Sequence, residues 1–136
     1  MRTARFTLRV VTEVTEAIRV SVETRFIEEQ SDPATDRYAF AYHVVISNES
    51  QRTVQLLRRH WFITVDGGNP REVEGPGVIG EQPVLEPGER HAYTSGAILE
   101  MPSGSMRGYY EMRDTDGESV RVRIPEFTLR MPRTLH

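Results

Sequence analysis

The sequence predicts an all-β domain, a β-sandwich of about seven strands. Apolar and polar residues alternate with a period of two along several segments, as they do in strands with one buried face. Turn signals rich in Gly, Pro, Asn and Asp separate these segments, recurring about every 8–12 residues. No stretch shows the helical period of an amphipathic helix.

The first two predicted strands form a hairpin with a long loop. In residues 17–27, one face carries Ile18, Val20, Val22, Thr24 and Phe26. The polar segment 28–36, which contains Pro33, is the loop. From Arg37 the alternation returns and places on one face Tyr38, Phe40, Tyr42, Val44 and Ile46.

The third predicted strand covers residues 53–66 and follows a turn at Asn48–Ser50, where short polar side chains can replace backbone partners. Its phase breaks at Leu56-Leu57 and again at Trp61-Phe62-Ile63. Adjacent apolar residues in a strand indicate a bulge or a strand covered on both faces. The turn DGGNP ends this strand, and residues 71–74 form a short edge strand.

The last three predicted strands are residues 90–99, 106–113 and 119–129. An Asp-Gly turn at Asp114–Gly117 joins the last two as a hairpin. Pro125 interrupts the final ladder, so this strand lies at an edge or is bulged there. The predicted domain therefore covers residues 17–130, with an N-terminal tail of residues 1–16 and a C-terminal tail of residues 131–136.

Composition indicates one globular domain and excludes several function classes. The chain has 136 residues, of which 38% are hydrophobic and 27% charged, and its net charge is −3. It has no Cys, which excludes disulfides, thiolate zinc sites and a Cys nucleophile and fits a cytoplasmic location. All 17 basic residues are Arg, so Schiff-base lysines and lysine-centred phosphate sites are excluded. The acidic balance argues against nucleic-acid binding, and no apolar run approaches the ~20 residues that cross a membrane.

Gly75, Gly77 and Gly80 spell GxGxxG, but the residues that follow exclude a dinucleotide-binding helix. Pro83 and Pro87 come soon after, and a proline inside a helix costs about 3 kcal/mol or more. The glycine loop, residues 75–89, can then be read in two ways. Its backbone N–H groups could bind an anion such as phosphate or pyrophosphate, or it could be a tight crossover between two sheets. Composition favours the crossover.

The densest mixed cluster is RRHW, residues 58–61. Because neighbours in a strand point to opposite faces, Arg58 and His60 share one face while Arg59 and Trp61 share the other. Trp61 is the predicted core tryptophan. The arginines either form an anion-binding or partner-binding patch, or cover the rim of Trp61. No metal site is predicted; if distant strands built one, His60 and His91 would be the better ligands.

No catalytic constellation is present in the sequence. There is no GxSxG motif, and Ser103-Gly104-Ser105 lacks an obvious base. Acidic residues at Asp114, Asp116 and Glu118 are explained by the hairpin turn, because the spacing lacks the rest of a calcium loop. We therefore expect no enzyme activity and no cofactor.

Six segments together resemble the ApaG family, also called DUF525 or CorD. They are VSVETRFIEEQS (20–31), YAFAYHVVISN (38–48), VQLLRRHWFIT (54–64), EVEGPGVIGEQPVLEPGE (72–89), YTSGAILEMPSGSMRGYYEM (93–112) and IPEFTL (124–129). The resemblance implies an immunoglobulin or fibronectin type III-like β-sandwich and a bacterial cytoplasmic protein linked to magnesium and cobalt homeostasis. Similar eukaryotic domains look like protein-interaction modules. The glycine motif proposed in that family as a nucleotide or pyrophosphate site corresponds here to Gly75, Gly77 and Gly80.

The sequence and the resemblance together lead to three hypotheses. The first is a non-enzymatic module that binds an unidentified protein partner. The alternative is a small-ligand binder that takes phosphate, pyrophosphate or a nucleotide at the glycine loop, helped by Arg58 or Arg107. The third is a divalent-cation protein, for which the resemblance argues more than the residues do. Exposed sandwich edges also permit a homodimer.

Overall fold

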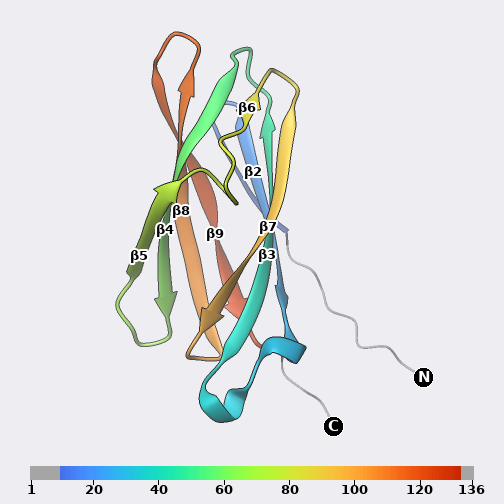
Figure 1. Cartoon of the computed structure of the whole chain (residues 1–136), viewed down its shortest axis with the longest axis vertical. Helices are drawn as coiled ribbons and strands as arrows, with labels where there is room; N and C mark the ends of the chain where they lie inside the picture. Colours follow the sequence, from blue (N-terminus) through green and yellow to red (C-terminus); the bar gives the residue numbers. More distant parts are fainter. Residues whose placement is uncertain (1–9, 133–136) are drawn as a thin grey trace, which may run out of the picture.

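The computed structural model describes residues 10–132, which form two antiparallel sheets packed face to face (Figure 1). The first sheet has the order β1-β2-β3-β7. Its strands are β1 Val10–Thr15, β2 Ile18–Phe26, β3 Tyr38–Asn48 and β7 Arg90–Leu99. Two 3-10 turns occupy the loop between β2 and β3, and they are η1 Glu28–Gln30 and η2 Pro33–Thr35.

The second sheet has the order β5-β4-β8-β9, and a two-residue strand, β6, pairs with the beginning of β4. Its strands are β4 Val54–Val65, β5 Arg71–Pro76, β6 Val84–Leu85, β8 Ser103–Asp114 and β9 Ser119–Arg130. The prediction of an all-β, fibronectin type III-like sandwich is confirmed. The described residues hold nine strands where the sequence predicted about seven; the two extra strands are β1 and β6.

The core lies between the sheets, where the alternating apolar faces of both meet. Trp61 is buried at its centre, as predicted, with its ring edge-on to three others. The ring-centroid distances are 5.4 Å to Tyr42, 5.8 Å to Phe127 and 6.5 Å to Tyr110. The predicted faces of β2 and β3 are confirmed, because their buried residues include Ile18, Val20, Val22, Phe40, Val44 and Ile46.

Of the three irregularities predicted in β4 and β9, two are bulges and one is not. The β4–β8 register shifts between Leu56 and Arg58, which confirms a bulge at Leu57. No shift occurs at Trp61-Phe62-Ile63; Trp61 points into the core and Phe62 lies half-buried on the opposite face. β9 is an edge strand, and its register with β8 shifts opposite Pro125, so both expectations for that residue are confirmed.

The assignment of residues 10–15 to an N-terminal tail is wrong, because they form β1 and pair with β2 from Thr15↔Ile18 to Val10↔Glu23. The turn between these strands has positive φ at Glu16 (47°) and Ala17 (63°). Such turns usually carry Asn or Gly, so the sequence gives no turn signal here. Residues 1–9 and 133–136 of the predicted tails lie outside the described residues.

Asn48 is a fully buried polar residue that joins the two sheets at the end of β3. Its Nδ2 donates to the carbonyl oxygens of Arg52 (2.7 Å) and Leu85 (2.9 Å). Its Oδ1 accepts from the backbone N–H (3.0 Å) and the hydroxyl (2.6 Å) of Ser50. The side-chain amide therefore uses both donors and both acceptor positions, which is the condition for burying it without penalty.

Asp114 organises the predicted hairpin turn between β8 and β9. Its Oδ1 accepts from the N–H groups of Asp116 and Glu118, both at 2.9 Å. Its Oδ2 accepts from Arg52 at 2.8 Å. The hydrogen bond from the Glu118 N–H, with those from Asp116 and Arg52, lowers the pKa of the Asp114 carboxyl.

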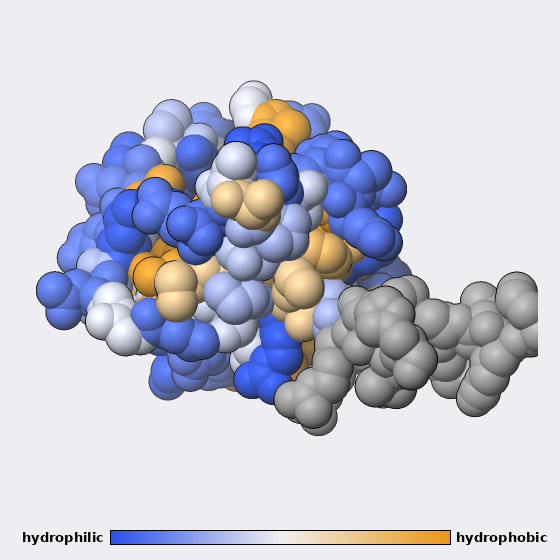
Figure 2. Space-filling model, turned by 90° about the horizontal axis from the view of Figure 1, so that it is seen from below, coloured by the Kyte–Doolittle hydropathy of each residue, from blue (hydrophilic) through white to orange (hydrophobic). Residues whose placement is uncertain are grey.

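Hydrophobic side chains do not gather into one patch at the end of the sandwich that Figure 2 shows from below; they are scattered among hydrophilic ones there. None of the helical segments in residues 10–132 is long or apolar enough to cross a lipid bilayer.

We expect Asn48→Asp to lower the free energy of unfolding by about 3 kcal/mol or more. The substitution replaces the amide nitrogen with an oxygen that faces two carbonyl oxygens. Asn69→Asp is the matched control, because Asn69 is exposed in a turn, and we expect a change within about 0.5 kcal/mol. Urea unfolding followed by circular dichroism measures both, and equal losses would contradict the role assigned to Asn48.

Candidate functional site

The outer face of the second sheet carries three rings that are not part of the core. β4 contributes His60 and Phe62, and the neighbouring β8 contributes Tyr109, which pairs with His60 in register. The His60 ring stacks on the Tyr109 ring at 4.8 Å and 19°, and the Phe62 ring lies 4.8 Å from His60 on the same strand. Such outer faces are usually polar, so a continuous row of rings is a local exception.

Two arginines cover this row of rings. The guanidinium of Arg107 on β8 lies 4.6 Å from the centroid of Phe62. The guanidinium of Arg121 on β9 lies 4.1 Å from the centroid of Tyr109. Both distances are within the range of cation–π attraction. We call these five residues, His60, Phe62, Arg107, Tyr109 and Arg121, the aromatic–arginine face.

Carboxylates border the aromatic–arginine face on the β5 side. His60 Nε2 lies 3.1 Å from Glu72, and His60 Nδ1 lies 3.2 Å from Glu74 and 3.1 Å from the Tyr109 hydroxyl. On the β9 side the face opens into a shallow groove of about 360 Å³, whose lining includes Phe62, Arg107, Tyr109, Arg121 and Arg123. The ring edges and guanidinium groups are thus held in place and reachable from outside.

The glycine loop is fastened to β4 by its own backbone. Gly77 N–H donates to the Leu57 carbonyl at 2.8 Å, so the bulge residue accepts from the loop. Val78 and Glu81 exchange N–H to carbonyl bonds at 2.8 and 3.0 Å, and Val78 is buried in the core. Three of the N–H groups that a phosphate cradle could use, those of Gly77, Val78 and Glu81, are therefore bonded within the protein itself.

The side chain of Arg59 contacts the glycine loop, and this contact is the opposite of what an anion site requires. Its Nη1 donates to the carbonyl oxygens of Pro76 (2.9 Å) and Gly77 (3.0 Å). The loop therefore presents acceptors to an internal cation where an anion site would present donors. Gly75 has no side chain because the Arg59 guanidinium fills that space: an added Cβ would lie 3.1 Å from Nη2.

The two arginines proposed to assist the loop point elsewhere. Arg58 neighbours Pro76 in the β4–β5 ladder, but its guanidinium turns outward to Glu74 at 3.8 Å. Arg107 lies opposite Phe62, five residues along β4 from the loop contact at Leu57. The structure thus brings Gly75 and Gly77 together with Arg59, and it places Arg58 and Arg107 on the outer face of the sheet.

The structure does not bring the two histidines together either. His60 lies on the outer face of β4, whereas His91 lies on β7 with Nε2 3.9 Å from Glu81. The two nitrogens of His60 contact different carboxylates, so these three groups do not converge on one point. Within residues 10–132 no group of three His, Asp or Glu residues has the arrangement of a metal site.

Three tyrosines meet inside the sandwich close to Arg59. The hydroxyls of Tyr93 on β7 and Tyr110 on β8 are hydrogen-bonded to each other across the two sheets. Burial raises the pKa of Tyr110 well above its ordinary value, and burial also raises the pKa of Tyr93 and Tyr42. The charge of Arg59 acts in the opposite direction on all three. The neutral hydroxyls of Tyr93 and Tyr110 therefore join the two sheets through their hydrogen bond.

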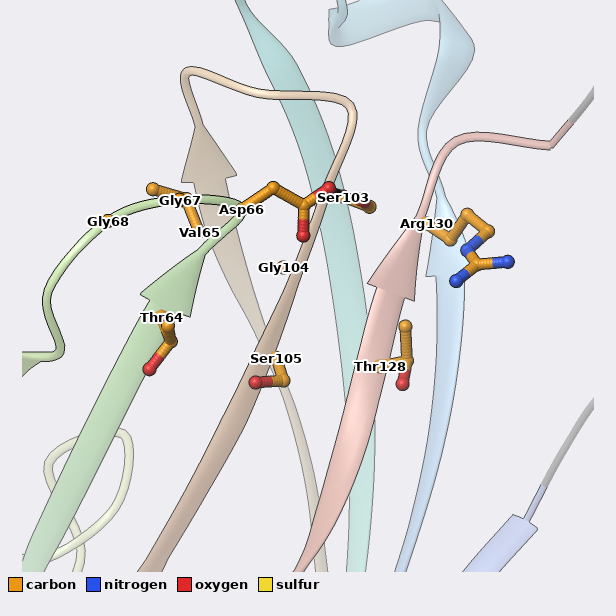
Figure 3. Close-up of a pocket in the computed structure, with 10 residues that line it drawn as sticks. All are labelled: Thr64, Val65, Asp66, Gly67, Gly68, Ser103, Gly104, Ser105, Thr128 and Arg130. Atoms are coloured by element: carbon orange, nitrogen blue, oxygen red, sulfur yellow. Dashed lines mark hydrogen bonds between the residues drawn. The ribbon is translucent and has the colours of Figure 1, made fainter.

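A second hollow, of about 330 Å³, lies at the other end of the second sheet (Figure 3). Thr64, Ser105 and Thr128 stand side by side there on β4, β8 and β9. Ser103 donates to the Asp66 carboxylate, and Figure 3 shows Arg130 turned away from the hydroxyl row. Ser103 therefore has a carboxylate partner but no histidine, and this hollow does not have the parts of a nucleophilic site.

Sequence reasoning missed Phe62 and Tyr109 as surface residues and Arg59 as the arginine of the loop. Phe62 follows the core residue Trp61, so only the alternation of the strand could have indicated its outward direction. Its neighbour Tyr109 lies 47 positions away in sequence and reaches His60 only through the β4–β8 register. No local pattern encodes that pairing.

Comparison with known proteins identifies relatives along most of the chain. The sequence profile of the ApaG domain, DUF525, matches residues 28–114. Protein ApaG of Acidithiobacillus ferrooxidans is 50% identical over 119 residues, which are 88% of this chain and 94% of that protein. Protein ApaG of Rhodospirillum centenum is 52% identical over 120 residues, which are 88% of this chain and 92% of that protein.

A solved structure agrees with the fold described above. The crystal structure of a Bordetella pertussis protein named ApaA superimposes with a TM-score of 0.82 at 47% sequence identity. The alignment covers 86% of this chain and 95% of that one.

We expect Gly77→Ala to destabilise the protein far more than Gly80→Ala. Both glycines have positive φ, 61° and 75°, which costs other residues about 1–2 kcal/mol. At Gly77 the new Cβ would also lie 2.2 Å from the Glu81 carbonyl oxygen, whereas at Gly80 nothing lies within 4 Å. The expected losses are about 3 kcal/mol or more for Gly77→Ala and about 1 kcal/mol for Gly80→Ala. Urea unfolding compares them, and equal losses would show that the loop does not pack against Glu81 as described.

We expect the free energy of unfolding to fall as the pH rises above about 10, the ordinary pKa of tyrosine. The unfolded chain loses its tyrosine protons there, while folded Tyr93 and Tyr110 keep theirs because their pKa is raised. The contribution of these two tyrosines to the free energy of unfolding is fully present below the pKa of tyrosine in the unfolded chain. It decreases as the pH rises from that value to the pKa of the folded state, by up to about 1.4 kcal/mol per pH unit for each group. Urea unfolding between pH 8 and 11.5 tests this. The variant Y93F/Y110F should show a shallower slope, and an unchanged slope would rule out these two groups.

Proposed function

The chain belongs to the ApaG domain family, and on that premise we propose that it is a non-enzymatic binding module whose partner is a protein. The observation that carries this proposal is the aromatic–arginine face. Tyr and Arg are the residues most enriched at the energetic centres of protein interfaces, together with Trp. Here Tyr109, Arg107 and Arg121 stand together on two paired strands, and the ring contacts of both arginines restrict their side chains before a partner binds, which lowers the entropy lost on binding.

The contacts within the face indicate how it would recognise a partner. Each guanidinium lies over an aromatic ring, and its N–H groups can donate to acceptors on the partner. Arg107 and Arg121 supply cationic donors near the shallow groove, and Arg123 lies beside them, bound to Glu13 at 3.2 Å. A partner with an apolar anchor flanked by carboxylates matches this arrangement.

The glycine loop is the alternative site, for phosphate, pyrophosphate or a nucleotide. Its inward N–H groups are occupied by Leu57 and Glu81, and Arg59 is bound to its carbonyls, so the geometry supports this alternative less well. A role in magnesium or cobalt homeostasis and a cytoplasmic location come from the family resemblance and from the lack of cysteine. Both are part of the proposal and independent of the aromatic–arginine face.

The test compares partner binding by face variants and a control on the same strand. Proteins captured from the native bacterium by the full-length chain are identified, and their affinity is measured by calorimetry. We expect Tyr109→Ala and Arg121→Ala each to weaken binding at least about 30-fold, which is the size of a hot-spot loss. Arg113→Ala is the control, because Arg113 is exposed on the same face of β8 outside the row of rings, and it should stay within about threefold.

A second arm separates the protein partner from a small ligand. Thermal unfolding is measured with pyrophosphate, ADP, ATP, diadenosine tetraphosphate, Mg²⁺ and Co²⁺. A ligand present at 100 times its Kd adds about 2.7 kcal/mol, which a melting curve resolves. Stabilisation by a phosphate compound would move the site to the alternative. Equal capture of the partner by Tyr109→Ala, Arg121→Ala and the control would remove the aromatic–arginine face as the interface.

A further inference from the structure

β7 is the last strand of the first sheet, and one of its edges has no strand beside it. It pairs with β3 over ten register positions, from Tyr38↔Leu99 to Ser47↔Arg90, and with no other strand of residues 10–132. The β3–β7 ladder contains no register shift, so the strand is regular along its length. Its outer edge therefore presents a continuous row of backbone donors and acceptors.

The other sheet edges carry devices that prevent strand addition. β5 has three charged residues and ends at Pro76. β9 has Arg121 and Arg123 and a bulge at Pro125. β1 is short, carries Glu13, and lies along β9, where Thr15 Oγ1 accepts from the Arg123 N–H at 3.1 Å. Charges, prolines, bulges and covering contacts are the usual protections of an edge strand.

Between its ends β7 has no charged residue, proline or bulge, and near its start the side chain of His91 lies 3.9 Å from Glu81 of the glycine loop. The nine residues from His91 to Leu99 include no Asp, Glu, Lys, Arg or Pro. On the outer face the strand exposes small and apolar side chains, which are Ala92, Thr94, Gly96 and Ile98. Ile98, near the end of this edge strand, is 49% exposed, which is high for a large apolar residue. This composition is suited to receive another strand.

The charges at the two ends of β7 identify that other strand. Arg90 is the first residue of β7 and Glu100 directly follows its last, and each lies five residues from Ser95. In an antiparallel pair of two β7 strands centred on Ser95, Arg90 of each copy lies opposite Glu100 of the other. Neither residue has an ion-pair partner within residues 10–132. Opposite charges directly across two strands are favourable, and this pairing makes two such contacts.

The side chains between these ends also match in size. The same pairing places exposed Ile98 opposite Ala92 and Thr94 opposite Gly96, so that each larger side chain on the outer face meets a small one. We propose that two copies of the chain associate through antiparallel pairing of β7 with β7, centred on Ser95, and form one continuous sheet of eight strands. The contact is two-fold symmetric and closes on itself.

Charge reversal tests the pairing on the purified full-length chain. Sedimentation equilibrium should show a concentration-dependent species of twice the 15.6 kDa of one chain. Arg90→Glu and Glu100→Arg each place like charges opposite one another at both ends and should weaken the dimer at least about tenfold. The double variant R90E/E100R restores the opposite charges and should restore the dimer. Arg71→Glu, on the exposed part of β5, is the control and should have no effect.

A cysteine cross-link tests the register, because the chain has no cysteine of its own. In the proposed pair the two Ser95 Cα atoms lie about 4.5–5.5 Å apart, which a disulfide can bridge. Ser95→Cys should therefore give a covalent dimer on mild oxidation, whereas Thr12→Cys, on β1, should not. A chain that stays monomeric at all concentrations would overturn the proposal. So would a dimer that ignores both charge reversals and does not cross-link at position 95.

Discussion

The buried amide of Asn48 is the constraint on which the arrangement of the two sheets depends. Asn48 is the last residue of β3 in the first sheet. Its side-chain amide donates to the carbonyl of Leu85 in β6 and to that of Arg52, just before β4. Its backbone also bonds Gly88 and Glu89, where the chain turns into β7. One fully satisfied side chain therefore fixes the return of the glycine loop and the entry into β7. Breaking one partner of such a network exposes the others to the full cost of an unmade bond.

The glycine loop follows from that anchoring and from Arg59. With β6 held at Asn48 and the loop N–H of Gly77 held at the Leu57 bulge, the backbone must pass close to the Arg59 guanidinium. Gly75 leaves room for that group, and Gly77 leaves room for the Glu81 carbonyl. Close packing within the protein thus explains why two of the three motif positions are glycine. The carbonyls that bind Arg59 also compensate the partial desolvation of its charge near Tyr93 and Tyr110.

The alternation of residues was enough to predict most strands and the core Trp61, because period two is a local property. It was not enough for β1, whose turn at Glu16-Ala17 has positive φ without Gly or Asn. Nor could it predict the aromatic–arginine face, because Phe62, Tyr109 and Arg121 lie on three strands whose order is set by long-range pairing. The loop arginine was assigned as Arg58 where the structure places Arg59, since only the observed contacts show which face meets the loop. The local alternation of residues predicts which side chains share a face of a strand, whereas the order of strands in the sheets determines which faces come into contact.

The two proposed contact surfaces lie on different sheets, and this separation has a consequence for binding. β7 is the edge of the first sheet, whereas the aromatic–arginine face is the outer side of the second. Pairing at β7 covers none of the five residues of that face, so a dimer would present it twice. A partner with two matching segments would then bind the second copy at a high effective concentration, and its avidity could exceed the affinity of one face by about 10²–10⁴ where the spacing allows both contacts. A moderate affinity at each face is therefore compatible with firm capture of a repeated or dimeric partner.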